Sequence, residues 1–314
     1  MVKKTLMPCR RRSRSKRPGD IGVARRQVVR RPLYRFADRG RMAAVMIRIS
    51  ILAALMLCTA TMAAAVDDLY RAQTVVTGQG EANRVIGFAA CLEDVLIKVS
   101  GSVKFAGDPR LAAYQSRAGD FVKAHNYHDQ MSGTPIRDEQ GTRDRPYDLI
   151  VDFDENKIDG LLGTLGSKPW LSHRPRVAVF AEMEQGARKY MVTADAGQSA
   201  VAPRESLLAA STRRGVSIVL PDDAALAKSG IDSEELANLP SATLAARAAE
   251  LGGEVALVGR LKWDDQDLGW ASEWQMEWQG RPHRWQLRGV TFDEAFRRAI
   301  GGAAQILSGN GDPG

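Results

Sequence analysis

The spacing of apolar residues predicts a long amphipathic helix over residues 81–100. Apolar side chains recur there every three or four positions, which places them on one face of an α-helix. These positions are Val85, Phe88, Ala89, Leu92, Val95, Leu96 and Val99. A β-rich segment, residues 69–76, comes before this helix, and Gly101 follows as the residue expected to end it.

The remainder of the first half is predicted to hold one more strand and two more helices. Asp108 followed by Pro109 is typical of a helix start. Between 131 and 146 the chain is polar and carries glycines and prolines, which favours a loop. The predicted elements are a helix from Asp108 to Val122, the loop, a strand over 147–153 with alternating apolar residues, and a short helix over 154–166.

The second half reads as alternating strands and helices that end in three consecutive strands. Thr291 and Glu294 form a capping box, in which each side chain satisfies backbone amides of the first helical turn. The predicted elements are a strand over 177–181, a polar loop over 184–202, a helix over 203–215, a strand over 216–220, a helix over 241–251, strands over 255–263, 270–279 and 283–290, and a helix from Phe292 to Ala303.

This element order predicts an α/β (α+β) protein of two domains, each a small mixed sheet with helices packed on it. The last three strands must form an antiparallel meander, because their connections are too short to cross over, and a helix closes the domain. The expected organisation is a basic disordered or non-native extension (1–45), a signal peptide (46–65), an N-terminal α/β domain (66–168), a linker (169–175), a C-terminal α/β domain (176–307) and a disordered tail (308–314).

Residues 46–65, MIRISILAALMLCTATMAAA, have the composition of a secretory signal peptide. Arg48 supplies the positive start, residues 49–62 the apolar stretch, and Ala63 and Ala65 the small residues expected before the cleavage site. Cleavage would leave Val66 as the first residue. The sequence therefore predicts a periplasmic protein that keeps no stable membrane span after cleavage.

Charge is distributed unevenly around this leader. The first 50 residues hold 16 basic and 2 acidic side chains, so the other 264 hold 28 and 35, a net charge of −7. Translated upstream sequence is the favoured explanation of the basic stretch. A nucleic-acid-binding arm and the cytoplasmic tail of an uncleaved, membrane-anchored form are alternatives, as is a lipoprotein modified at Cys58. Nucleic acid is not an expected partner of the exported part.

Several segments together carry a resemblance to a known family. They are LYRAQTVV, VLIKVSG, DLIVDFD, RPRVAVF and AELGGEVALVGRLKW. Over residues 68–307 the chain resembles the domain-of-unknown-function 2066 family of exported Gram-negative proteins, a resemblance that implies no activity. Residues 176–306 also resemble, in element order only, the amino-terminal domain of TolB and the middle domain of a flagellar assembly protein. That likeness implies partners among other envelope proteins.

Tryptophan is concentrated in the predicted meander. Because strand side chains repeat every second residue, Trp270, Trp274 and Trp278 share one face. Together with Trp285 they form a possible binding surface, either for sugar rings of peptidoglycan or for a partner protein. The alternative, which the sequence favours, is that this face packs in the core. The opposite face, with Glu273, Gln275, Glu277 and Gln279, should then face water.

No metal or cofactor site is predicted. Asp152, Asp154 and Asn156 imitate the start of a calcium loop, but Lys157 and Gly163 occupy positions where such a loop needs glycine and glutamate. His125 and His128 lack a third ligand for zinc. The remaining candidates are read as surface or hairpin-loop residues, namely His173, His283, Asp264, Asp265 and Asp267.

No catalytic residue is predicted either. After the leader the sequence lacks the G-x-S-x-G, H-E-x-x-H and S-x-x-K motifs, and the only cysteine there, Cys91, is expected to be buried. The favoured hypothesis is a non-catalytic binding or assembly protein of the cell envelope. The alternative is a protein that binds or cleaves peptidoglycan through the tryptophan-rich meander, with Glu273 or Asp267 as acidic neighbours.

Overall fold

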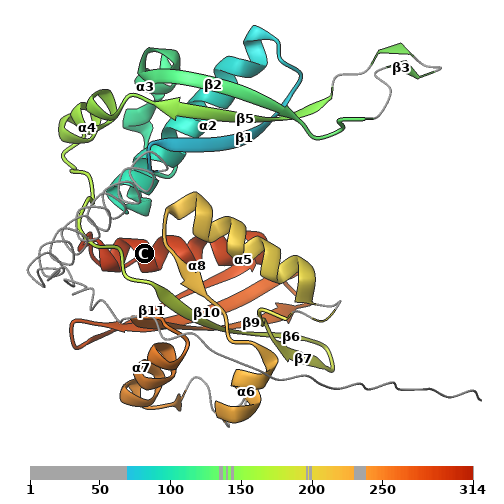
Figure 1. The fold of residues 1–314 in the computed structure, drawn as a ribbon, viewed down its shortest axis with the longest axis vertical. Helices are drawn as coiled ribbons and strands as arrows, with labels where there is room; N and C mark the ends of the chain where they lie inside the picture. Colours follow the sequence, from blue (N-terminus) through green and yellow to red (C-terminus); the bar gives the residue numbers. More distant parts are fainter. Residues whose placement is uncertain are drawn as a thin grey trace, which may run out of the picture. The chain divides into compact units, whose positions relative to one another are not determined.

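The fold has a three-stranded antiparallel sheet and a six-stranded mixed sheet, each covered by helices, and a small two-stranded sheet of β3 (Arg137–Asp138) and β4 (Gly141–Thr142) (Figure 1). The computed structural model describes residues 69–133, 137–138, 141–142, 145–195, 197, 200–229 and 238–313, all within the unit Cys58–Gly314. The α+β class is confirmed, with the antiparallel meander and the closing helix. The predicted extension 1–45 and signal peptide 46–65 lie outside the described residues. Within those residues, no helix is both long enough and apolar enough to span a membrane.

The first sheet has the strand order β1 (Arg71–Thr77), β5 (Pro146–Phe153), β2 (Val122–Asp129). Helix α2 (Glu81–Ser100) packs on one of its faces, against alternating residues such as Val76 and Leu149. Gly87 permits this approach, because a Cβ at that position would lie 2.5 Å from Cδ2 of Leu149. The shorter elements are η1 (Val103–Phe105), η2 (Pro109–Leu111), α3 (Ala112–Gln115), η3 (Ala118–Phe121), α4 (Glu155–Thr164), β3 (Arg137–Asp138) and β4 (Gly141–Thr142).

The predicted helix from Asp108 to Val122 is wrong in most of its length. The carboxylate of Asp108 does accept a hydrogen bond from the Arg110 amide, but the turn it starts is 3-10, and only α3 is α-helical. The chain then enters β2, which pairs with β5 over its whole length. Gly119 interrupts the helical pattern, and pairing with β5 satisfies the backbone groups that follow.

The second sheet has the strand order β11-β10-β9-β6-β7. Strands β7 and β8 pair with the same edge of β6, β8 at the start of β6 and β7 at its end. Strand β6 is parallel to β9 and β8, and the other neighbours are antiparallel. The strands are β6 (Val177–Gln185), β7 (Arg188–Met191), β8 (Ile218–Val219), β9 (Val255–Asp264), β10 (Gly269–Trp278) and β11 (Arg281–Val290).

Helices cover both faces of this sheet. Figure 1 shows α5 (Val201–Arg214) and α8 (Phe292–Leu307) on one face, and α6 (Asp223–Ser229) and α7 (Ser241–Glu250) on the other. The larger core lies under α5 and α8 and includes Val179, Leu257 and Phe296. The smaller core lies under α7 and includes Phe180 and Val258.

Two segments of the second half differ from their predictions, and helix α6 was not predicted at all. The predicted polar loop 184–202 contains the end of β6 and the strand β7, which form a hairpin. The predicted disordered tail is held in place over residues 308–313. Asn310 donates from Nδ2 to the Ser100 carbonyl at 3.0 Å, and Gln305 donates from Nε2 to the Asp312 carbonyl at 2.7 Å. Both segments are polar. Pairing with the adjacent strand β6 orders the first, and hydrogen bonds such as that from Asn310 to Ser100 order the second.

Candidate functional site

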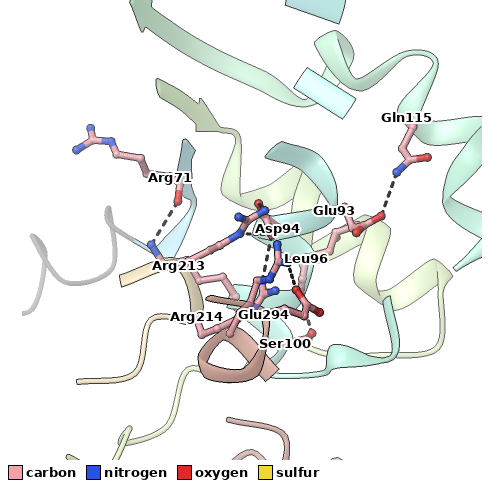
Figure 2. A network of polar contacts seen from close by, with 11 residues as sticks. Arg71, Glu93, Asp94, Leu96, Ser100, Gln115, Arg213, Arg214 and Glu294 are labelled. Atoms are coloured by element: carbon pink, nitrogen blue, oxygen red, sulfur yellow. Dashed lines mark hydrogen bonds and ion pairs between the residues drawn. The ribbon is translucent and has the colours of Figure 1, made fainter. Parts of the chain in front are cut away.

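A buried acid on α2 links the first sheet to the helices of the second. Asp94 lies 2.5 Å from Nη2 of Arg213 and 3.1 Å from Nη1 of Arg214, both in the last turn of α5 (Figure 2). The Asp94 and Arg214 side chains are less than a tenth exposed. Burial lowers the pKa of Arg214, and the negative charge of Asp94 acts in the opposite direction. This pair therefore fixes the C-terminal half of α2 against α5.

Arg174 strengthens the same junction from the predicted linker. Its guanidinium stacks on the ring of Trp170, 4.2 Å from the centroid. It donates to the carbonyls of Lys98 at 2.9 Å and Gly215 at 3.1 Å. These carbonyls lie at the C-terminal ends of α2 and α5, where the helix dipole favours a cation. Burial lowers the pKa of Arg174 to about 10. Residues 169–175 are thus docked at Trp170 and Arg174.

The N-terminal half of α2 carries an exposed apolar surface, which we call the α2 stripe. Ile86 is 67% exposed and Val85 46% exposed, and of the alanines beside them only Ala89 is half-buried. The stripe consists of Ala82, Val85, Ile86, Ala89 and Ala90. Isolated exposed apolar residues are ordinary, but five on adjacent turns of one helix form a contiguous patch, which is typical of an interaction site.

Part of the core predicted from the sequence is wrong at the α2 stripe. The sequence places Val85 and Ala89 on the buried face of the helix, but in the structure Val85 is exposed and Ala89 half-buried. From Asp94 to Ser100 every residue of α2 is buried, whereas in the first half only Gly87 and Phe88 are. The apolar pattern is the same in both halves. The two halves differ only in whether other parts of the chain pack over them, and no local sequence pattern predicts that difference.

The tryptophans considered as a binding surface lie largely inside the protein. Trp270, Trp274 and Trp285 are buried in the larger core, and Trp278 packs against it. Trp274 contacts the ring of Phe296 on α8, with centroids 6.1 Å apart. Trp274 therefore packs against α8, and the three buried indoles offer little surface to a sugar ring.

The opposite face of the second sheet is polar along β10 and bears paired charges on β6, β7 and β9. Glu182, which is buried, lies 3.3 Å from Arg260 and 3.4 Å from Lys189. Glu184 lies 2.9 Å from Lys262 and 3.3 Å from Arg260. The hydrogen bond from Lys262 lowers the pKa of Glu184. These pairs run across β7, β6 and β9 and stabilise the part of the face that α7 does not cover.

Two hollows lie on this polar face. One, of about 320 Å³, is lined by residues such as Ser241, Glu277 and Arg284. The other, of about 330 Å³, is lined by Lys262, Glu273 and others. Each combines acidic and basic side chains, so neither has the single charge sign that would select a cation or an anion.

The remaining candidates occupy structural positions. Asp154 caps α4 by accepting a hydrogen bond from the Lys157 amide at 3.0 Å. The ring of His125 packs edge-on against Phe88, and His128 lies 3.4 Å from Asp148. The other pairings are Asp152 with Arg71, His173 with Glu254, His283 with Asp312, Asp264 with the Gln266 and Asp267 amides, and Asp265 with the Trp263 indole.

No catalytic or metal-binding cluster emerges from these positions. Across the part of the chain that the structure describes, no three His, Cys, Asp or Glu side chains are grouped as a metal ion would need. Sequence reasoning found neither Asp94 nor Arg174, because their partners are distant in the sequence.

A family model matches part of the first half of the chain. Residues 63–171 match the model of a family described as a domain of unknown function (DUF8605). The resemblance to the domain-of-unknown-function 2066 family is therefore wrong, and no finding supports the likeness to the amino-terminal domain of TolB. No curated protein matches the chain. Over the segment that holds the first sheet and α2, the chain is similar to a family with no described activity.

Proposed function

We propose that the chain is exported through the leader at residues 46–65 and acts in the periplasm as a binding module. In this proposal it holds another envelope protein on the α2 stripe. The observation that carries the proposal is the exposure of Val85 and Ile86 on a helix whose C-terminal half is buried. Burial of such a water-exposed apolar surface under a partner lowers the free energy, so it favours binding.

The junction around Asp94 and Arg174 supports this role. Because these residues hold the end of α2 in place, the stripe lies on a helix that is already ordered. Binding to such a preorganised surface avoids much of the entropy cost of fixing the helix. We propose binding in preference to glycan cleavage, since three of the four tryptophans considered for stacking lie in the core.

The test compares three forms of the chain, each exported with its own leader and isolated after formaldehyde crosslinking in cells. They are the unchanged chain, Ile86→Glu on the stripe, and Leu208→Glu at an exposed apolar position on α5. We expect a protein that co-purifies with the first and third forms and is lost from the second. Identical recoveries from all three, with equal thermal stability, would contradict the proposal.

A further inference from the structure

We infer that the α2 stripe receives a basic amphipathic helix of its partner, an inference that rests on the proposed function. The relevant geometry is two adjacent rows of every fourth residue along α2. The first row is Glu81, Val85, Ala89 and Glu93, and the second is Ala82, Ile86, Ala90 and Asp94. Both rows are apolar in the middle and acidic at their C-terminal end.

The second row is already a helix-docking surface at its end. Asp94 accepts Arg213 and Arg214 from α5, and this contact is buried (Figure 2). The exposed part of the row, Ala82, Ile86 and Ala90, is continuous with that contact. We therefore expect a second helix there, with basic residues that reach an acid of α2 and an apolar ridge that covers Ile86.

Side-chain size in the stripe suits helix packing. Ala82, Ala89 and Ala90 leave shallow positions around Val85 and Ile86. Ridges of a second helix can settle into such positions and bring the two helix axes close together. From Ala82 to Ala90 the stripe is about 12 Å long, which matches two turns of a partner helix.

Charge selects the chemistry of that helix. Glu81 and Glu93 bracket the stripe, about 18 Å apart along the helix axis. Figure 2 shows Glu93 directed away from Arg213 and Arg214, toward Gln115, whose neutral amide donates to it at 3.3 Å. A partner with Lys or Arg at both ends of its apolar face complements these acids. The same acids repel an anionic membrane surface.

Area argues against a second copy of this chain as the occupant. Stable protein interfaces bury about 800 Å² on each partner. A stripe two helical turns long provides only a fraction of that area. Its length is sufficient to contact one short helix of a partner.

The test uses helical peptides of about 18 residues, a length at which an isolated helix can form. One carries a Leu and Ala face with Lys at both ends, and the second has the same face with Glu at both ends. Binding of each to the purified full chain is measured by fluorescence anisotropy at low salt. The chain is used unchanged and as Ile86→Glu, Glu93→Lys and Leu208→Glu.

We expect the Lys-ended peptide to bind at least about tenfold more tightly than the Glu-ended one, because it complements Glu81 and Glu93. Glu93→Lys should remove or reverse that preference, Ile86→Glu should weaken both peptides at least about tenfold, and Leu208→Glu should change neither. No saturable binding of the Lys-ended peptide, or equal affinity for both peptides, would overturn the inference.

Two other occupants, a second copy of the chain and a membrane, are tested by measurements on the same proteins. Sedimentation that shows a dimer of the unchanged chain, lost in Ile86→Glu, would assign the stripe to a second copy and overturn the inference. Binding to phosphatidylglycerol vesicles that Ile86→Glu abolishes would assign it to a membrane, with the same consequence. If the peptides fail while the crosslinked partner still depends on Ile86, this inference is wrong and the proposed function stands.

Discussion

Gly259 fixes the position of a core side chain, the indole of Trp274. The two are paired across β10 and β9, and Trp274 is 1% exposed. A Cβ added to Gly259 would lie 2.1 Å from the Trp274 ring, far inside van der Waals contact. The missing side chain of the glycine thus makes the space that the indole fills.

Gly259→Ala is therefore expected to destabilise the fold. Displacing a buried indole from a packed core costs about 1–3 kcal/mol. Urea denaturation measures the loss in the free energy of unfolding. Gly160→Ala on α4 is the matched control, because a Cβ there meets nothing within 4 Å, and it should be neutral or slightly stabilising. Equal effects of the two substitutions would contradict the packing argument.

Cys91 should be inert in the folded chain. Burial, with a smaller contribution from the charge of Asp94, raises the pKa of its thiol to about 12. At pH 8 the thiolate fraction is then on the order of 1000-fold below that of an unfolded cysteine, and iodoacetamide alkylation should slow at least as much. The measurement uses a chain with Cys9→Ser and Cys58→Ser, in buffer and in urea. Equal rates in the two solvents would contradict it.

The same raised pKa gives stability a pH dependence. Below about pH 8 the thiol is protonated in both states, so its contribution is constant. Between about pH 9 and 12 the unfolded chain loses the proton and the folded chain keeps it. Cys91 therefore makes the free energy of unfolding fall as pH rises through this window. In Cys91→Ala that part of the decline should be absent.

At the scale of elements, the junction between α2 and α5 depends on one acid. Replacing Asp94 by Asn leaves the buried Arg214 and its neighbour Arg213 without their counter-charge, which we expect to cost about 3–5 kcal/mol. Asp152→Asn, at the more exposed pair with Arg71, should cost less than about 1 kcal/mol. Thermal denaturation of the two variants checks the difference, and similar losses would contradict the assignment.

How well an element could be predicted from the sequence depended on where its stabilising contacts come from. Helix α8 was predicted, because its start is local: Thr291 caps it by accepting a hydrogen bond from the Glu294 amide. Strands β2 and β7 were missed, because both are polar edge strands that strand pairing with β5 and β6 holds in place. The alternation of apolar residues that signals a half-buried strand is weak in both.

At the scale of the whole molecule, the fold class and the meander with its closing helix followed from element order alone. The candidate site did not. Asp94 and Arg213 are 119 residues apart, so no local pattern connects them. Exposure of the α2 stripe depends on which half of α2 the rest of the chain covers, and the sequence assigned Val85 to the core for that reason.

Export remains a prediction that a measurement on the cell-derived protein can check. If the leader is cleaved after Ala65, amino-terminal sequencing of the periplasmic protein should begin at Val66, and the intact mass should correspond to residues 66–314. A product that begins at Met1 and stays in the cytoplasm would contradict the predicted location and, with it, the class of partner.

The most direct test of the central claim, that the α2 stripe binds another protein, is site-specific photo-crosslinking in cells. A photoreactive amino acid replaces Ile86 in one chain and Leu208 in another, and both are irradiated under the same conditions. Our account predicts a discrete heterologous adduct from position 86, suppressed by Glu93→Lys in the same chain, and none of that mass from position 208. Equal adducts from both positions, or none from position 86, would contradict it.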